Sequence, residues 1–268
     1  MAKRGVFLPI FDDLADPRLL GELGALAESA GWDGVFLWDH VVYRAPIRSA
    51  TDAWIAMACI AQQTSSIVFG PMVTPLARRR PHVLARQVVA LDQLSGGRFV
   101  LGVGLGLDAS GRELSRFGEE LDDRRRAEML DEALDLVGAL VSGTRVDHRG
   151  PHYTAADVTF EPAAVNGRVP TWVAARWPNR RPLRRAARHD GLFIIDVDGP
   201  DDLAAAIDFV RSERGGDMDG YEIVANVEDA DDVTPWTNAG ATWTLTDFDP
   251  FTLTLPQVRA RIERGPGG

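Results

Sequence analysis

Short apolar segments alternate along the chain with longer stretches in which apolar residues recur every three or four positions. The short segments predict buried strands, and the longer stretches predict amphipathic helices. Strands are predicted at residues 5–10, 34–38, 67–74, 98–104, 171–175, 192–197, 221–227 and 241–246. Helices are predicted at residues 17–30, 51–63, 81–94, 123–142, 182–188, 201–214, 233–239 and 256–263. Strands and helices that alternate in one chain of this length favour a single α/β domain over residues 1–268, a (β/α)8 TIM barrel.

Residues 107–170 interrupt this alternation. The long helix predicted at residues 123–142 is followed by a predicted hairpin at residues 146–153, whose turn is marked by Gly150 and Pro151. We expect the helix and the hairpin to form an excursion between the fourth and fifth strands of the barrel, not a separate domain.

The strand–helix–strand segment at residues 67–106 is unusual where each of its strands ends. The first strand is interrupted at Gly70 and Pro71, and the second ends in the run GVGLG at residues 102–106. Because ligands bind at the carboxyl ends of parallel strands, both places are candidate site positions. An open Rossmann-type sheet is the alternative. It is weaker, because the run supplies only the pattern GxGxxA and no acidic residue on a following strand about 20 positions later.

Composition and charge narrow the class of protein. With 45% hydrophobic and 25% charged residues, the chain has the composition of an ordinary globular enzyme. Its net charge of −10 disfavours nucleic acid as a partner, because phosphate binding needs a basic surface. No apolar stretch approaches the roughly 20 residues of a membrane helix, and the N-terminus lacks the apolar run of a signal peptide. We therefore expect a cytoplasmic protein that binds neither nucleic acid nor a membrane.

Few residues suggest metal or nucleophilic chemistry. The single cysteine, Cys59, excludes an internal disulfide and a cysteine-rich metal site. His148, His152 and His189 share no helix face or strand with a pair of carboxylates, so no metal site is predicted. The nucleophile pattern Gly-x-Ser-x-Gly is absent.

Arginines cluster at residues 78–80, 124–126 and 176–188. For residues 124–126 a solvated helix face is the preferred interpretation. The other two clusters flank the carboxyl ends of predicted strands, where an anionic ligand is a fair alternative to a solvated surface.

Four segments, in this order, carry a resemblance to a known family. They are GWDGVFLWDH at residues 31–40, VTPLARRRP at 73–81, LSGGR at 94–98 with LGVGLG at 101–106, and PTWVAARWPNRRP at 170–182. On these segments the chain resembles the bacterial luciferase-like flavin-dependent oxidoreductases over nearly its whole length. The resemblance is greatest to the branch that includes deazaflavin-using enzymes of actinobacteria.

The resemblance implies a barrel that holds FMN or the deazaflavin coenzyme F-420 at the carboxyl ends of its strands. Pro71 and Met72 match a bulge after the third strand that supports the flavin ring, and the Pro71–Met72 peptide bond is expected to be cis. Thr74 matches a residue that hydrogen-bonds the ring. Asp39 and His40 match a pair near the reactive edge of the ring, where His40 is the expected proton donor or acceptor and Asp39 sets its tautomer.

The resemblance also implies where the cofactor's tail lies. Gly104, Leu105 and Gly106 match a loop that approaches the ribityl chain and the phosphate. Small residues suit such a close approach of the backbone.

Ala174 and Ala175 stand where relatives carry two glycines that bind the phosphate at the start of a helix. Backbone N–H donors survive this change, but a positive φ angle does not survive it cheaply. Arg176 is expected to compensate by contacting the phosphate directly.

These expectations lead to one main hypothesis and three alternatives. The main hypothesis is an oxidoreductase that moves a hydride between coenzyme F-420, or FMN, and a small organic substrate. With FMN, the enzyme would instead be a monooxygenase that activates oxygen. A flavin-binding protein without turnover is the alternative from another class, and a metal-dependent barrel hydrolase is the weakest. The resemblance also implies a homodimer.

Overall fold

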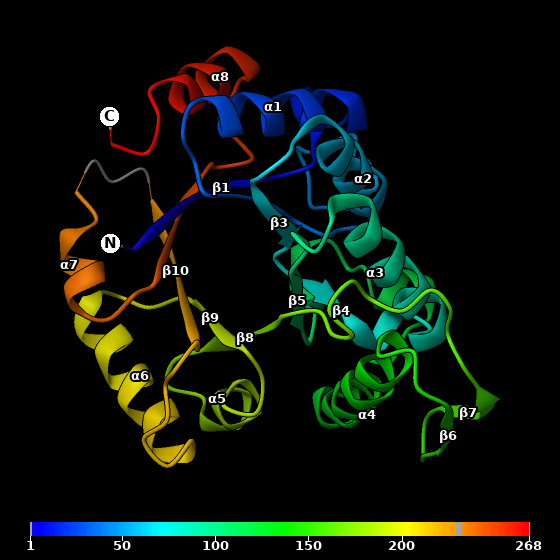
Figure 1. Ribbon diagram of the computed structural model, residues 1–268. Helices are drawn as coiled ribbons and strands as arrows, with labels where there is room; N and C mark the ends of the chain where they lie inside the picture. Colours follow the sequence, from blue (N-terminus) through cyan, green and yellow to red (C-terminus); the bar gives the residue numbers. More distant parts are fainter. Residues whose placement is uncertain (1, 229–231, 268) are drawn as a thin grey trace.

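Parallel strands form a nearly closed barrel with helices around it, as Figure 1 shows for the computed structural model of the protein. The structure describes residues 2–228 and 232–267. Within those ranges one sheet holds nine parallel strands in the order β3-β2-β1-β11-β10-β9-β8-β5-β4. The strands are β1 (Lys3–Leu8), β2 (Gly34–Leu37), β3 (Val68–Pro71), β4 (Thr74–Pro75), β5 (Leu101–Gly104), β8 (Thr171–Arg176), β9 (Gly191–Ile195), β10 (Glu222–Glu228) and β11 (Trp243–Asp247).

The two ends of this sheet meet and nearly close the barrel. β4 pairs with β5, and an isolated parallel bridge joins Phe69 of β3 to Phe99 just before β5. A Cβ atom on Gly102 would lie only 2.0 Å from the backbone oxygen of Pro71, so glycine is required where β3 and β5 approach. β3 and β4 are therefore two pieces of the third barrel strand, and the predicted (β/α)8 barrel is confirmed.

Helices cover the outside of the barrel in Figure 1. They are α1 (Pro17–Ser29), α2 (Ala53–Gln63), α3 (Pro81–Ser95), α4 (Asp123–Val141), α5 (Arg180–Ala186), α6 (Pro200–Glu213), α7 (Thr234–Asn238) and α8 (Leu255–Glu263). Short 3-10 turns lie at Asp12–Leu14, Leu76–Arg78, Asp108–Ser110 and Ser115–Phe117. None of the helices in the described ranges is long and apolar enough to cross a membrane.

The segment between β5 and β8 contains both a barrel helix and an addition to the barrel. α4 packs beside α3, as the helix after the fourth strand does in this fold. β6 (Val146–Arg149) and β7 (Thr154–Val158) pair antiparallel in a separate small sheet at the edge of the molecule. The helix that we expected in the excursion is thus part of the helical ring. The loop at residues 105–122, the hairpin and the irregular segment at residues 159–170 lie outside the repeat.

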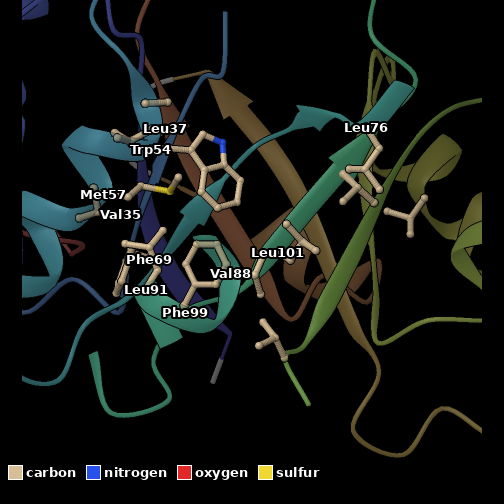
Figure 2. Close-up of a cluster of buried hydrophobic side chains, with 14 of the residues drawn as sticks. Val35, Leu37, Trp54, Met57, Phe69, Leu76, Val88, Leu91, Phe99 and Leu101 are labelled. Atoms are coloured by element: carbon tan, nitrogen blue, oxygen red, sulfur yellow. The ribbon is translucent and has the colours of Figure 1, made fainter. Parts of the chain in front are cut away.

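Apolar side chains fill the space both outside and inside the barrel. Figure 2 shows the outer cluster, where side chains of β2, β3 and β5 meet those of α2 and α3. The labelled members are Val35, Leu37, Trp54, Met57, Phe69, Leu76, Val88, Leu91, Phe99 and Leu101. Inside the barrel, Trp172 has its ring centroid 5.5 Å from those of both Phe36 and Trp243. The described residues thus fill the barrel interior as a packed core, so a ligand site is expected at a mouth of the barrel and not within it.

The cis peptide bond of the third strand lies one residue later than predicted. The structure has a cis bond between Met72 and Val73, so the expected cis bond between Pro71 and Met72 is wrong. The reason is that the strand pairing continues further than the sequence suggests. Pro71 is in register with Leu37, and the backbone N–H of Met72 still donates to the carbonyl oxygen of Leu37 at 2.7 Å. The backbone leaves the sheet only after that bond.

One carboxylate on α1 ties the start of the third strand to the helical ring. Glu28 accepts hydrogen bonds from the backbone N–H groups of Ser65, Ser66 and Ile67 at 2.6–2.9 Å. Burial opposes its ionisation, but the three N–H donors outweigh burial and lower the pKa of Glu28 from 4.5 to about 2.

We expect Glu28→Ala to lower the free energy of unfolding by about 2–3 kcal/mol near neutral pH, because it leaves the three N–H groups without their acceptor. The folded-state pKa lies below the unfolded-state value, so this stabilisation is present above pH 4.5 and is lost as the pH falls toward 2. Urea unfolding at about pH 7 and about pH 3 measures both effects. Glu22→Ala is the matched control, because Glu22 lies on the same helix in an exposed ion pair with Arg259. Equal losses in the two variants, or a difference between them at about pH 3 that is as large as at about pH 7, would contradict the prediction.

Candidate functional site

A cleft of about 540 Å³ opens at the carboxyl ends of the barrel strands. This volume lies within the range of about 300–1,000 Å³ that is usual for small-molecule sites. Of the eleven residues predicted for the site, nine line the cleft: Asp39, His40, Met72, Gly104, Leu105, Gly106, Ala174, Ala175 and Arg176. The other two, Pro71 and Thr74, are buried behind its wall.

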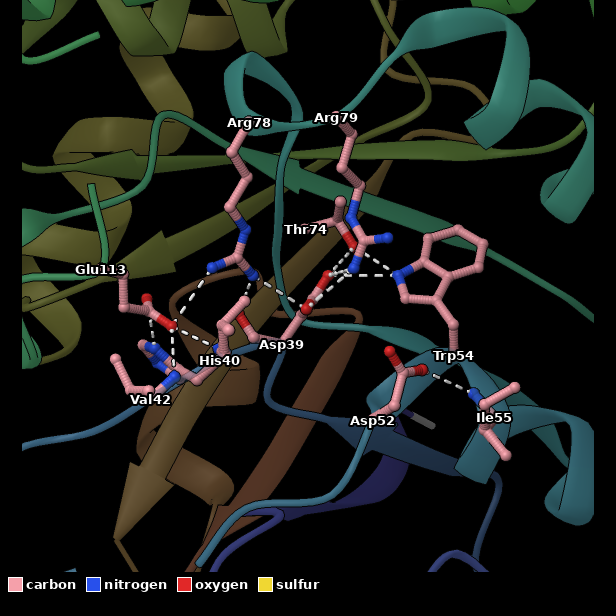
Figure 3. A network of polar contacts seen from close by, with 11 residues as sticks. Asp39, His40, Val42, Asp52, Trp54, Ile55, Thr74, Arg78, Arg79 and Glu113 are labelled. Carbon is pink, nitrogen blue, oxygen red and sulfur yellow. Dashed lines mark hydrogen bonds and ion pairs between the residues drawn. The ribbon is translucent and has the colours of Figure 1, made fainter. Parts of the chain in front are cut away.

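Asp39 is held by a network of buried polar side chains, shown in Figure 3. Arg78 Nη2 donates to Asp39 Oδ1 at 2.9 Å, and Arg79 Nη2 donates to Oδ2 at 2.8 Å. Thr74 Oγ1 and Trp54 Nε1 also donate to Oδ2, at 2.7 and 3.1 Å. Thr74 therefore contacts Asp39 where the resemblance implies a contact with the flavin ring.

Burial by itself would raise the pKa of Asp39, but the charges of Arg79 and Arg78 and the hydrogen bonds from Thr74 and Trp54 bring it below its usual range. Asp39 is therefore an ionised group that joins the ends of two barrel strands. The side chains of Arg78 and Arg79 bind this carboxylate. For these two arginines of the cluster at residues 78–80, the anion is therefore Asp39 and not a ligand.

His40 is oriented by Glu113, not by Asp39 as predicted. His40 Nδ1 lies 2.8 Å from Glu113 Oε2 (Figure 3). Glu113 Oε1 lies 3.2 Å from Arg78 Nη1 and accepts hydrogen bonds from the backbone N–H groups of Val41 and Val42. The oxygens of Asp39 already accept five hydrogen bonds from Arg78, Arg79, Thr74 and Trp54, which occupy its acceptor sites.

The state of Glu113 sets the state of its partner. Burial would raise the pKa of Glu113, whereas the hydrogen bond and charge of His40, followed by the charge of Arg78, bring it below its usual range. An ionised carboxylate only accepts hydrogen bonds, so Nδ1 of His40 is the donor. In the neutral imidazole, Nε2 is then a free base, and no partner for it is found in the part of the chain that the structure describes.

Glu113 is the main site residue that the sequence did not suggest. It is one of several acidic residues in the irregular loop at residues 105–122, where no periodic pattern places side chains. The loop is shaped by Asp108, whose Oδ1 accepts from the backbone N–H groups of Leu114 and Ser115 at 2.8 and 2.9 Å. This turn directs Glu113 toward the end of β2, a contact between residues 73 positions apart.

One side of the cleft, the small-residue half, is formed by Val73, Pro75, Gly104, Gly106 and Ala174 at the ends of β4, β5 and β8. A Cβ atom on Gly104 would lie 2.5 Å from Val73 Cγ2 and 3.5 Å from the Cβ atom of Ala174. The three residues are thus in close contact and leave a shallow wall with little side-chain volume. Such a wall fits a flat ring system.

The opposite side, the aromatic half, is formed by Phe7, Trp38, Tyr43, Phe193 and Asn226 from β1, β9, β10 and the end of β2. The ring of Phe7 lies 5.6 Å from that of Trp38 and 5.8 Å from that of Phe193, and the ring of Tyr43 lies 5.0 Å from that of His40. His40 is therefore the polar group at the junction of the two halves.

The two alanines that replace the family's glycines are accommodated without a positive φ angle. Ala174 and Ala175 are inside β8 and adopt extended backbone. Arg176 ends the strand and forms an ion pair with Asp196, and α5 starts only at Arg180. The positive φ angle that alanine adopts only at a cost is thus not required at these two positions.

Arg126 differs from the solvated position preferred for its cluster. It is 3% exposed, lines the cleft and pairs with Asp123 at 2.5 Å. Its Nη1 also donates to the backbone oxygen of Leu121 at 2.7 Å, so it fastens the loop after β5 to the start of α4.

The cleft fits a flavin or a deazaflavin in size and in its shallow wall. Trp38 Nε1 and Asn226 Oδ1 are buried and have no hydrogen-bond partner among the described residues, which indicates a polar ligand. Within the described ranges, no three His, Cys, Asp or Glu side chains are placed to hold a metal ion.

Comparisons with known proteins show what this chain is similar to. An F-420-dependent glucose-6-phosphate dehydrogenase of Nocardia farcinica is 29% identical over 231 residues, which are 82% of this chain and 66% of that protein. Other relatives of that name are 31–32% identical, and this chain spans about half of their length.

Two solved structures have the same fold. A coenzyme F-420-dependent tetrahydromethanopterin reductase of Methanopyrus kandleri superimposes with a TM-score of 0.79 at 17% identity, covering 98% of this chain and 96% of that one. The oxygenating constituent of 3,6-diketocamphane monooxygenase from Pseudomonas putida, in complex with FMN, gives a TM-score of 0.70 at 19% identity and covers 85% and 67%. The model of the luciferase-like monooxygenase family matches residues 3–229, and the chain belongs to this family.

Proposed function

We propose that the protein is an oxidoreductase that transfers a hydride between bound coenzyme F-420 and a small organic molecule in the cleft. The strongest support is the pair of His40 and Glu113, which puts a free imidazole nitrogen at the junction of a shallow wall and an aromatic pocket. The sequence relatives named as F-420-dependent dehydrogenases support the choice of cofactor. We also propose that residues 1–268 form one barrel domain.

The small-residue half would hold the cofactor. Met72 would lie beneath the ring, with Pro71 and Thr74 buried behind it as support. The tail would leave over Gly104, Leu105 and Gly106 toward the end of β8, where Ala174, Ala175 and Arg176 would hold the phosphate. When bound, a deazaflavin supplies a ring carbon that accepts or gives a hydride as a two-electron unit.

The chain's own residues would handle the proton and the positioning. His40 Nε2 takes a proton from a substrate hydroxyl, or returns one to a carbonyl oxygen, as general base or acid. Glu113 holds the ring by Nδ1 and stabilises the imidazolium that forms. Asp39 acts as a positioning residue, since it fixes Arg78, which in turn contacts Glu113. The aromatic half excludes water from the substrate.

We also propose a cytoplasmic homodimer. Its support is the family resemblance, together with Ile55 and Val83, two apolar side chains 59% and 50% exposed in the first turns of α2 and α3. Size-exclusion chromatography with light scattering tests the dimer, which should have twice the chain mass of 29.2 kDa.

Titration of the purified protein with coenzyme F-420 and with FMN tests the choice of cofactor. We expect coenzyme F-420 to bind with a Kd in the low micromolar range and at least about tenfold more tightly than FMN. The fluorescence of each cofactor reports its binding. Tighter binding of FMN would favour the oxygen-using monooxygenase. Binding with no reduction or oxidation by any substrate would favour a binding protein without turnover. Failure of both cofactors to bind below about 100 μM would refute the enzyme proposal.

The small-residue half provides a matched pair of glycine variants. Gly104→Ala adds a Cβ atom 2.5 Å from Val73, so the wall must shift, and we expect at least about tenfold weaker binding of coenzyme F-420. Gly138→Ala on α4 adds a methyl group with nothing within 4 Å and should leave the Kd unchanged. Equal Kd values for the two variants would place the cofactor elsewhere.

A further inference from the structure

We infer that the substrate is an uncharged molecule with an apolar, ring-sized body and one hydroxyl or carbonyl group, which binds in the aromatic half of the cleft beside Asn226. This inference rests on the proposed function, because it takes the small-residue half as the cofactor's side. It concerns what the cleft selects, which can be measured without turnover.

The shape of the aromatic half selects the apolar body. The rings of Phe7, Trp38 and Phe193 meet at tilted or edge-on angles with centroids 5.6–5.8 Å apart, so they line a pocket instead of stacking on one another. Tyr43 and His40 continue this wall, with their rings 5.0 Å apart. A flat or cyclic hydrocarbon body buries its surface well against such faces.

Two buried atoms select the polar group. Asn226 Nδ2 donates to Asp247 Oδ2 at 2.8 Å, which fixes the amide and leaves Oδ1 as an acceptor with no partner among the described residues. Trp38 Nε1 is a buried donor that likewise has no partner there. A buried donor or acceptor that stays unpaired is costly. An alcohol hydroxyl can donate to Oδ1 or accept from Nε1, whereas an ionised phosphate or carboxylate has no proton to give to Oδ1.

The charges of the cleft disfavour an anionic substrate. Of the three cations that line the cleft, Arg176 lies on the cofactor's side at the end of β8, and Arg126 and Arg185 are paired with Asp123 and Asp131 at 2.5 and 2.7 Å. In the described part of the chain, no lysine or arginine lines the aromatic half, and Asp247 adds a carboxylate to it. A phosphate placed there would lose its hydration without gaining a counter-ion. The aromatic half is therefore expected to bind an uncharged substrate and to reject a sugar phosphate.

The same group is the one that the chemistry needs. The hydroxyl carries one proton, so it donates either to Asn226 Oδ1 or, after rotation about the C–O bond, to His40 Nε2. In the second orientation the carbinol carbon gives its hydride to the cofactor, and His40 Nε2 accepts the proton from the oxygen. A carbonyl compound remains, and the electrons balance with the two-electron cofactor. The reverse direction reduces the carbonyl compound.

Ligand-observed NMR with four probes tests the selection, on the protein alone and with coenzyme F-420 added. The probes are benzyl alcohol, toluene as the same body without the hydroxyl, phenyl phosphate as the charged counterpart, and glucose 6-phosphate. We expect benzyl alcohol to bind about five- to tenfold more tightly than toluene, and both phosphates to show no binding up to about 10 mM. Tighter binding of either phosphate, or no binding of any probe, would overturn the inference.

Two asparagine variants locate the selection. Asn226→Leu should remove the preference for benzyl alcohol and leave the Kd of toluene within about twofold, because only the acceptor is lost. Asn238→Leu, at an exposed position on α7, should change neither value. If Asn226→Leu does not fold, Asn226→Ser shortens the side chain and is expected to weaken the preference. A preference that survives both replacements of Asn226 would refute the role of this residue.

The two proposals fail separately. If the alcohol preference depends on Asn226 but coenzyme F-420 does not bind, the selection stands and the proposed function falls. If coenzyme F-420 binds tightly and glucose 6-phosphate is the best of the four probes, the proposed function stands and the inference is wrong.

Discussion

Replacing Asp39 with alanine is expected to lower the free energy of unfolding by about 3–5 kcal/mol. The side chain of Asp39 is 4% exposed and bonds to Arg78 and Arg79, of which Arg78 is itself only 6% exposed. Removing one partner of a buried ion pair leaves the other charge without compensation, and this costs far more than the loss of a surface contact. Urea unfolding near neutral pH measures the effect.

Asp52→Ala is the matched control for this result. Asp52 is a nearby aspartate (Figure 3) that caps α2 through the backbone N–H of Ile55 at 2.9 Å, and its loss should cost about 1 kcal/mol. If Asp39→Ala is too unstable to measure, Asp39→Asn keeps the shape and removes the charge. A loss no larger than that of Asp52→Ala would show that the network does not depend on this carboxylate.

The effect of Asp39 should also depend on pH. Because the pKa of Asp39 is lowered in the fold, its stabilisation is complete above the unfolded-state value of about 3.9 and is lost as the pH falls below it. The difference in stability between the protein and Asp39→Asn should therefore shrink in acid.

Replacing His40 with alanine is expected to lower kcat/KM about 10²- to 10⁴-fold, the usual contribution of a general acid or base. The value of kcat/KM is measured with the best-binding alcohol by monitoring the loss of coenzyme F-420 absorbance. The Kd of coenzyme F-420 should change less than about threefold, because the imidazole is placed toward the substrate. Added imidazole should restore part of the rate in the alanine variant, as a purely structural role would not allow.

His82→Ala is the control, since His82 is exposed in the first turn of α3. Glu113→Gln should have a smaller effect than His40→Ala together with a changed pH profile, because Glu113 acts through the imidazole that it holds. A His40→Ala variant that keeps more than about a tenth of the activity would remove His40 from the proton transfer.

The elements of the barrel could be predicted because their ends carry local signals. α3 begins at Pro81 and is closed by Gly96, whose φ of 66° is the left-handed conformation that glycine adopts easily. α4 begins after Asp122, whose side chain accepts from the backbone N–H of Arg125. Such signals depend on neighbours in sequence, so they survive without knowledge of the fold.

The contacts of the site could be predicted only in part, because they join distant residues. The carboxyl ends of strands indicated His40 and Gly104, but Glu113 approaches His40 through a loop with no repeating pattern. The partner of Arg78 could not be predicted either, because a run of arginines has the same composition whether it binds an anionic ligand or a buried aspartate of the chain. The place where the third strand leaves the sheet depends on its pairing with Leu37, which the sequence of the strand does not contain.

The division of the cleft between different strands has a consequence for how such a protein can diverge. The small-residue half comes from β4, β5 and β8, whereas the aromatic half comes from β1, β2, β9 and β10. β1 and β10 pair with none of β4, β5 and β8, so a replacement at Phe7 or Asn226 need not disturb Gly104 or Ala174, whereas Phe193 is the register partner of Ala174. We expect barrels that descend from one ancestor to acquire new substrates through mutations in the aromatic half, while the small-residue half is inherited unchanged.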